Sequence, residues 1–210
     1  MTRRIHDIGE AAGILRSGGV LVLGTDTLPG LHCLVPRDKA VERIFTLKGR
    51  ASDRPLLVLA GSPAQARSIC GPLDRRQEKT LEKVWPGPFS VILPAGPDVP
   101  GIVTAGGATV AIRVPRLAPL RELILAAGTP LVSTSANLSG HSPTPDPAEA
   151  AAVFGDGIDG WWAAPGRPPA GGRASAVVDL TVRPPRVVRE GPEPWDDAWS
   201  ADLDEDSPEE

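Results

Sequence analysis

The chain has 210 residues, of which 41% are hydrophobic and 4% aromatic, and it carries a formal net charge of −4 at pH 7. This length and composition predict one α/β domain with a single sizeable core rather than two domains. No apolar run approaches the roughly 18 residues that cross a bilayer, and the first residues lack the apolar stretch of a signal peptide, so we expect a cytoplasmic protein without membrane contact. The two cysteines and three scattered histidines lack metal-ligand spacing, so we expect reduced thiols and no metal held by protein side chains.

The charge is distributed unevenly along the sequence. Residues 193–210 contain nine acidic side chains and no Lys or Arg, which leaves residues 1–192 with 22 basic and 17 acidic side chains and a net charge of +5. A run of acids with few aliphatic residues resists packing. We therefore predict a folded domain over residues 1–192 and an acidic, disordered tail over residues 193–210, and the basic domain suits a polyanionic ligand.

Short apolar runs alternate with helical patterns along the chain, which is typical of an α/β protein. The 24 prolines and 23 glycines are spread between these elements and form no low-complexity segment. The expected elements, in chain order, are a strand at 20–23, a helix at 38–48, a strand at 56–60, a helix beginning at the capping box 62–65, a helix at 75–84, strands at 89–93 and 110–114, a helix at 117–127, a strand at 130–132, a helix beginning at 146, and strands at 176–180 and 186–189.

Three cations lie close together where the helix at 38–48 is expected to end. Lys48 and Gly49 have an ordinary explanation, because helices often end with a cation that complements the dipole and a glycine that reverses the chain. Arg50 and Arg54 lie beyond the helix end and have no such explanation. Since arginine forks bind phosphate bidentately and lysine supplies a point charge, the cluster suits a polyphosphate.

A polar run follows the predicted strand at 130–132. It reads Ser133-Thr134-Ser135-Ala136-Asn137-Leu138-Ser139-Gly140. Hydroxyl, amide and backbone N–H groups at the carboxyl end of a strand can bind phosphate or carboxylate oxygens, and open α/β sheets bind ligands at that end. A Ser/Asn-rich turn without a ligand is the alternative that the run alone leaves open.

The strand at 110–114 contains an arginine among apolar residues. Strand alternation puts Ala111 and Arg113 on the face opposite Val110, Ile112 and Val114. An arginine in that position needs an anionic partner, unless it is a solvated charge on an edge strand.

Together these segments resemble the YrdC-like threonylcarbamoyl-AMP synthase family over about residues 10–191, because seven motifs occur in the family's order. Each motif is weak by itself, and the order and spacing carry the resemblance. The motifs are Thr25-Asp26-Thr27-Leu28-Pro29-Gly30-Leu31, Lys48-Gly49-Arg50 with Arg54-Pro55-Leu56, Trp85-Pro86-Gly87-Pro88, Thr109-Val110-Ala111-Ile112-Arg113-Val114-Pro115, Ser135-Ala136-Asn137-Leu138-Ser139-Gly140, Ser175-Ala176-Val177-Val178-Asp179 and Arg189-Glu190-Gly191.

The sequence departs from the family pattern at three positions. Gly24 stands where the family has proline, Pro29 where it has tyrosine, and Leu59 where it has histidine. The resemblance assigns the tyrosine and the histidine to the amino-acid side of the pocket, whereas the phosphate side is intact. The nucleotide assignment is therefore firmer than the threonine assignment.

The resemblance implies a fold, a reaction and a set of site residues. The fold is a single-domain, twisted sheet of mixed parallel and antiparallel strands, flanked by helices, with a concave ligand cleft. The reaction is that of a nucleotidyltransferase, which condenses L-threonine, bicarbonate and ATP with Mg²⁺ into threonylcarbamoyl-AMP and pyrophosphate. A downstream threonylcarbamoyl transferase would use this product to modify tRNA, and the family implies contact with tRNA or other double-stranded RNA.

By the same resemblance, Lys48 and Arg50 are the catalytic residues, which position ATP and neutralise charge on its phosphates. The full set of candidates divides into two sides. The ATP side comprises Lys48, Arg50, Arg54, Thr109, Ser135, Asn137 and Arg189. The threonine side comprises Thr27, Arg113, Ser133 and Ser175, with Arg113 pairing with the substrate carboxylate.

Two alternative functions and the role of one loop stay open from the sequence alone. A divergent paralogue would adenylate or carbamoylate another acceptor, and a catalytically inactive RNA-binding module would use the basic domain without turnover. The Gly/Pro-rich stretch at 163–172 is either a loop over a pocket or plain surface.

Overall fold

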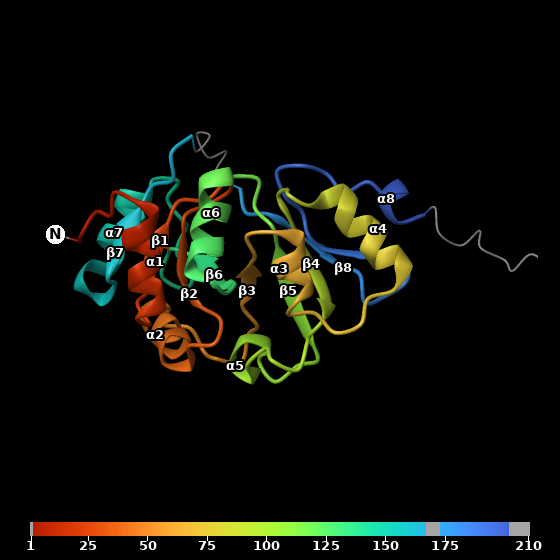
Figure 1. Ribbon diagram of the computed structural model, residues 1–210, viewed down its shortest axis with the longest axis horizontal. Coiled ribbons are helices and arrows are strands. Elements are labelled where there is room, and N and C mark those ends of the chain that lie inside the picture. The colour runs from red at the N-terminus through yellow and green to blue at the C-terminus, as the bar shows by residue number, and fades with distance from the viewer. Residues whose placement is uncertain (1, 167–172, 202–210) are drawn as a thin grey trace, which may run out of the picture.

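The computed structural model describes residues 2–166 and 173–201 as one nine-stranded sheet with helices packed against it (Figure 1). The strands are β1 Leu21–Leu23, β2 Gly30–Leu34, β3 Leu57–Leu59, β4 Phe89–Pro94, β5 Thr109–Arg113, β6 Leu131–Ser135, β7 Gly160–Trp162, β8 Ala176–Asp179 and β9 Arg186–Arg189. The helices are α1 Ile8–Arg16, α2 Asp38–Lys48, α3 Pro63–Arg67, α4 Arg75–Val84, α5 Gly101–Thr104, α6 Ala118–Ala127, α7 Pro147–Phe154 and α8 Ala198–Ala201, with a 3₁₀ turn at Gly155–Gly157.

The strand order is β7-β1-β2-β6-β3-β5-β4-β8-β9. The pairs β1–β7, β3–β5 and β4–β8 are parallel and the other pairs are antiparallel. This arrangement confirms the expected α/β fold with a mixed sheet. No helix in the described part of the chain is both long enough and apolar enough to cross a membrane.

Figure 1 shows an elongated molecule, in which α1, α2, α6 and α7 gather around one half of the sheet and α3, α4 and α8 around the other half. Neighbouring residues of one strand belong to different hydrophobic clusters. Val58 and Val132 pack in the cluster that contains α2 and α7, whereas Leu59 and Leu131 pack in the cluster that contains α1 and α6. Alternation along each strand therefore divides the core between the two faces of the sheet.

The strand register aligns residues on the face covered by α1 and α6. His32 of β2 pairs with Ser133 of β6, Ser133 with Leu57 of β3, and Leu57 with Ala111 of β5. The next row on the same face contains Leu131, Leu59 and Arg113. The register thus places the polar run after 132 and Arg113 on one surface, as the predicted alternation of 110–114 requires.

The segment that begins at residue 193 differs from the expected disordered tail. Residues 193–201 pack on the domain, because Trp195 and Trp199 make edge-on contacts with Phe89, at ring-centroid distances of 5.9 and 5.2 Å. Arg116 also donates two hydrogen bonds to the Glu193 carboxylate, at 2.6 and 3.1 Å. Two large aromatic side chains bury enough apolar surface to offset the charge of the segment. Residues 202–210 lie outside the described residues.

The Gly/Pro-rich stretch at 163–172 lies largely outside the described residues, since 167–172 are among those not described. The choice between a loop over a pocket and plain surface therefore stays open.

Replacing Trp199 by alanine tests the packing of residues 193–201. Trp199 contacts both Phe89 and Trp195, and its carbonyl accepts a hydrogen bond from Thr80 Oγ1 at 3.3 Å. We expect Trp199→Ala to remove about 1–2 kcal/mol and to lower the melting temperature by about 2–8 °C. The matched control is Val153→Ala at an exposed position. An unchanged melting temperature for Trp199→Ala, measured by calorimetry, would show that the segment contributes nothing to stability.

Candidate functional site

A cavity of about 490 Å³ lies on the sheet face that carries Arg113. Leu59 belongs both to its wall and to the core under α1 and α6, so the cavity begins at the edge of that helix layer. Eight of the predicted site residues line it, from both expected sides: Thr27, Arg50, Arg113, Ser133, Ser135, Asn137, Ser175 and Arg189. The structure thus brings together residues that are more than 160 positions apart in the sequence.

Lys48 and Arg54 line a second hollow of about 510 Å³, which adjoins the first and shares Arg50, Ser135 and Asn137 with it. Thr109 lines neither hollow. It lies on the same strand as Arg113, at the opposite end of β5. The structure therefore does not bring Thr109 to the site with the other candidates.

Lys48 forms hydrogen bonds with two residues of the polar run that follows residue 132. The left-handed backbone of Gly49, with φ at 59°, ends α2 as expected. Lys48 is the last residue of this helix, and its buried side chain extends to the end of β6. Its ammonium donates to the carbonyls of Ser135 at 2.5 Å and Asn137 at 2.8 Å. Burial, followed by the charge of Arg50, lowers the pKa of Lys48 to about 8.

Arg50 forms a wall shared by three hollows. Its Nη2 donates to the Pro55 carbonyl at 3.3 Å, and its buried Nε has no hydrogen-bond partner among the residues that the structure describes. Burial is the first cause that lowers the pKa of Arg50, and the charge of Arg54 is the second. The charge of Asp53 opposes this shift, although Arg50 forms no salt bridge with it within residues 2–166 and 173–201.

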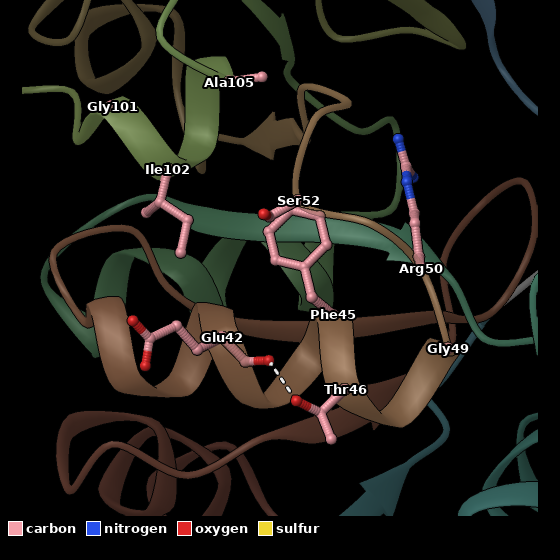
Figure 2. A pocket seen from close by; sticks show the side chains of 9 residues that line it. All are labelled: Glu42, Phe45, Thr46, Gly49, Arg50, Ser52, Gly101, Ile102 and Ala105. Atoms are coloured by element: carbon pink, nitrogen blue, oxygen red, sulfur yellow. Dashed lines mark hydrogen bonds between the residues drawn. The ribbon is translucent and has the colours of Figure 1, made fainter.

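Figure 2 shows the third hollow, of about 530 Å³, between α2 and α5. Phe45 and Ile102 point into it, while Arg50 extends along its edge away from them. The hollow between the two helices thus has both apolar and polar walls, and Arg50 also belongs to the two hollows beside β6.

Four cations of the site form no salt bridge within residues 2–166 and 173–201. They are Lys48, Arg50, Arg54 and Arg189, whereas Arg113 pairs with Asp26. Asp53 also lines the second hollow, but Lys48, Arg50 and Arg54 outnumber it there. This excess of positive charge favours an anionic ligand with several charges.

Arg113 is the most strongly buried charged side chain of the site, with 2% of its surface exposed. Its Nη2 donates to Asp26 Oδ1 at 2.5 Å and its Nη1 to Thr27 Oγ1 at 2.8 Å. Asp26 Oδ2 accepts a further bond from the backbone N–H of Arg116 at 2.8 Å. Burial lowers the pKa of Arg113, and the charge of Asp26 opposes this shift. Sequence reasoning missed Asp26, although it lies between the two threonines of the first motif.

The hydroxyl of Thr27 supports Arg113 rather than standing free for a ligand. Thr25 Oγ1 donates to the Leu28 carbonyl at 2.8 Å, so in the 3.1 Å contact between the two threonine hydroxyls Thr27 is the donor. Because Thr27 also accepts from Arg113, it retains only one acceptor position for a ligand.

Ser133 is paired with a histidine that sequence reasoning also missed. Its Oγ lies 3.1 Å from Nε2 of His32, a fully buried side chain on the neighbouring strand. Burial is the main cause that lowers the pKa of His32 to about 3; the Gly30 backbone opposes the shift and the charge of Arg113 adds to it. The imidazole is therefore neutral at physiological pH. The sequence offered one indication of this pair, because His32 is a polar residue within an otherwise apolar segment.

Ser175 and Arg189 form one unit, although they were expected on different sides of the site. Arg189 Nε and Nη2 donate to the Ser175 carbonyl at 3.1 and 2.9 Å. The Ser175 hydroxyl is 2.8 Å from that of Ser90. The pair thus fixes the Arg189 fork beside the cavity.

Of the three residues that depart from the family pattern, only Leu59 lines the cavity. Leu59 lies in the cavity wall, paired with Arg113 across the parallel strands. The Pro29 carbonyl accepts the Ala136 N–H at 2.9 Å, and Gly24 donates its N–H to the Trp162 carbonyl at 2.9 Å. The wall beside Arg113 is therefore apolar at position 59. In the described part of the chain, no three or more His, Cys, Asp or Glu residues group closely enough to hold a metal.

Known proteins share both the sequence pattern and the fold. The family profile Sua5_yciO_yrdC, described as telomere recombination, matches residues 13–191. A threonylcarbamoyl-AMP synthase of Bacillus subtilis (strain 168) is 39% identical over 151 residues, which are 71% of this chain and 43% of that protein.

Two solved structures are similar to the fold. Sua5 of P. abyssi in complex with L-threonine has a TM-score of 0.81 and 32% identity, over 90% of this chain and 56% of that chain. YciO of E. coli has a TM-score of 0.82 and 25% identity, over 92% of this chain and 98% of that chain. The chain thus spans about half the length of the Bacillus and P. abyssi proteins.

The lowered pKa of Lys48 predicts proton uptake when a polyphosphate binds beside it, and ATP is the probe. At pH 8 about half of the Lys48 ammonium groups are deprotonated in the free protein, and phosphate oxygens favour the charged form. We expect ATP binding at pH 8 to take up about half a proton and ATP affinity to fall as the pH rises above 8. Titration calorimetry in buffers of different ionisation enthalpy measures the uptake. The Lys48→Met variant should lose it, and equal uptake in both proteins would contradict the assignment.

Proposed function

The chain belongs to the Sua5/YciO/YrdC family, and on this basis we propose that it is an L-threonylcarbamoyladenylate synthase. It condenses L-threonine, bicarbonate and ATP into threonylcarbamoyl-AMP and pyrophosphate. The observation that carries the proposal is a cavity with an excess of cations at one end, none of them in a salt bridge within the described residues, and a buried, neutralised arginine at the other.

The cationic end suits a triphosphate. Lys48, Arg50 and Arg54 come from one short segment, and the polar run after β6 faces them across the second hollow. An Mg²⁺ ion that arrives with ATP keeps most of its water shell and needs few protein ligands. Phosphate charge would complete the pairing that the protein leaves open.

The other end suits an amino acid. Arg113 is held by Asp26 and Thr27, so its fork has a fixed orientation before any ligand binds. A planar fork recognises a carboxylate by two parallel hydrogen bonds. The P. abyssi relative that binds L-threonine has the same fold, which supports an amino-acid substrate at this end.

The reaction requires positioning and charge neutralisation rather than a protein nucleophile. The threonine amine attacks the carbon of bicarbonate to form a carbamate with loss of water. A carbamate oxygen then attacks the α-phosphorus of ATP, and the bond to pyrophosphate breaks. Lys48 and Arg50 stabilise the charge that develops on the phosphate oxygens.

The product is an activated carbamoyl adenylate. A threonylcarbamoyl transferase is the class of enzyme that would move its acyl group to tRNA adenosine. The net charge of +5 on residues 1–192 favours contact with tRNA or other double-stranded RNA near this transfer.

A divergent paralogue with another acceptor is the second candidate. YciO matches almost over its whole length, and the chain contains no tyrosine and has leucine at position 59. These features favour a changed acceptor while the phosphate end is retained.

Pyrophosphate release tests the proposed function directly. We expect release from ATP and bicarbonate to depend on L-threonine in the full-length chain. Lys48→Ala should reduce it at least tenfold, because the loss of a charged hydrogen bond costs about 1.5–3 kcal/mol. The matched control is Lys39→Ala, an exposed lysine on the same helix. Release that requires a different amine instead of threonine would favour the second candidate.

Arg113→Lys tests the acceptor end. The substitution keeps the charge but loses the planar fork, so we expect the KM for threonine to rise about tenfold while the KM for ATP hardly changes. Arg116→Lys is the control, because its side chain is exposed and contacts Glu193. A large rise in the KM for ATP would move Arg113 to the phosphate end.

A further inference from the structure

One wall of the cavity contains a row of residues that combines a hydroxyl group with apolar side chains. Ser133, Leu57 and Ala111 lie side by side on three neighbouring strands and all line the cavity. His32 completes the row behind Ser133 and lines no part of the cavity. The row therefore offers a ligand one hydroxyl and two apolar surfaces.

The row lies between the two ends of the proposed site. Arg113 belongs to the next row in one direction, and Ser135, whose carbonyl binds Lys48, belongs to the next row in the other direction. With the carboxylate of an amino acid on Arg113 and its amine directed toward the phosphates, its side chain contacts the row of Ser133. This placement rests on the proposed function.

The other hydroxyls near Arg113 have hydrogen-bond partners of their own or lie outside the row that contains Ser133. Thr25 donates to Leu28, and Thr27 donates to Thr25 and accepts from Arg113. Ser90 and Ser175 bind each other. Within the described residues the Ser133 hydroxyl has a single partner, His32, and so retains hydrogen-bonding capacity toward the cavity.

His32 holds the Ser133 hydroxyl from a rigid position. The side chain is fully buried, and its lowered pKa keeps it neutral. A Cβ added at Gly30 would lie 2.7 Å from His32 Cε1, so the imidazole packs directly against the Gly30 backbone. Whichever of the two groups donates in the Ser133–His32 bond, the serine keeps a donor or an acceptor for a ligand hydroxyl.

We propose that His32 is a positioning residue, which orients Ser133 to bind the side-chain hydroxyl of the acceptor, so that the His32–Ser133 pair selects threonine against valine. Threonine presents one hydroxyl and one methyl group, which match Ser133 on one side and Leu57 with Ala111 on the other. Valine would leave the remaining hydrogen-bonding capacity of the buried serine unused, since only His32 would then bind it. A site that binds a substrate hydroxyl discriminates against the analogue without it for this reason.

The test compares kcat/KM for L-threonine and L-valine by pyrophosphate release. We expect the wild type to prefer threonine by roughly 10- to 100-fold, the effect of one buried hydrogen bond. Ser133→Ala and His32→Leu should each lose most of this preference, and the double variant should lose no more than Ser133→Ala alone. His32→Gln, which keeps a hydrogen-bonding group near the position of Nε2, should retain it.

Cys33→Ala is the matched control for stability. Cys33 is buried on the same strand as His32 but faces the opposite side of the sheet, so its removal should leave the threonine preference unchanged. The KM for ATP should not change in any of these variants. A retained preference in Ser133→Ala, or in His32→Leu with Ser133 present, would overturn the proposal.

Binding of L-threonine and L-valine to the ATP-loaded proteins, measured by calorimetry, separates this proposal from the proposed function. If the wild type binds threonine but releases no pyrophosphate, the synthase assignment fails, and the same variants decide the role of His32 from their binding preference. If the wild type does not distinguish threonine from valine by either measurement, the role of His32 is overturned.

Discussion

The buried guanidinium of Arg113 is the constraint on which the site depends. A charge with 2% of its surface exposed is stable only when it is paired and hydrogen-bonded, and Asp26 and Thr27 meet both needs. Removing one partner of such a pair costs about 3–5 kcal/mol. The pair joins β5 to the segment between β1 and β2, and the second oxygen of Asp26 fixes the backbone at Arg116. One carboxylate therefore sets the geometry of the acceptor end and the course of the chain beyond β5.

At the opposite end of the site, the cations are held in place without a carboxylate among the described residues that neutralises them by a salt bridge. Lys48 is held by two carbonyls and Arg50 by one weak backbone contact, so their positive charge is oriented but not neutralised. Such an arrangement costs stability in the free protein, which the lowered pKa of Lys48 reflects. The cost is recovered when an anion binds. Buried cations that repel one another in the free protein are expected at a ligand-binding site, where function rather than stability determines the residues.

The sequence was informative where one local signal decides the structure. The apolar run before Thr25, the helix that ends at Gly49 and the alternation around Arg113 depend on neighbours within a few residues, and all three are present as predicted. Asp26 and His32 were not predicted, because their significance lies in partners 87 and 101 positions away. The packing of Trp195 and Trp199 was obscured by the surrounding acids, since local charge density carries no information on an apolar surface formed by α4 and β4. Long-range pairing, rather than propensity, determined what was missed.

In the proposed function, the two ends of the site recognise their ligands by different physical means. Four cations without salt bridges in the described part of the chain outnumber the nearby Asp53 and provide a net positive field, which would attract a polyphosphate of any detailed shape. At the acceptor end, Asp26 cancels the charge of Arg113, so a carboxylate there gains little from net charge and depends on the direction of the remaining N–H groups. Weak net attraction makes binding sensitive to each further contact. The row of one hydroxyl and two apolar surfaces beside Arg113 can therefore govern which amino acid binds, even though Pro29 and Leu59 contribute no polar group to it.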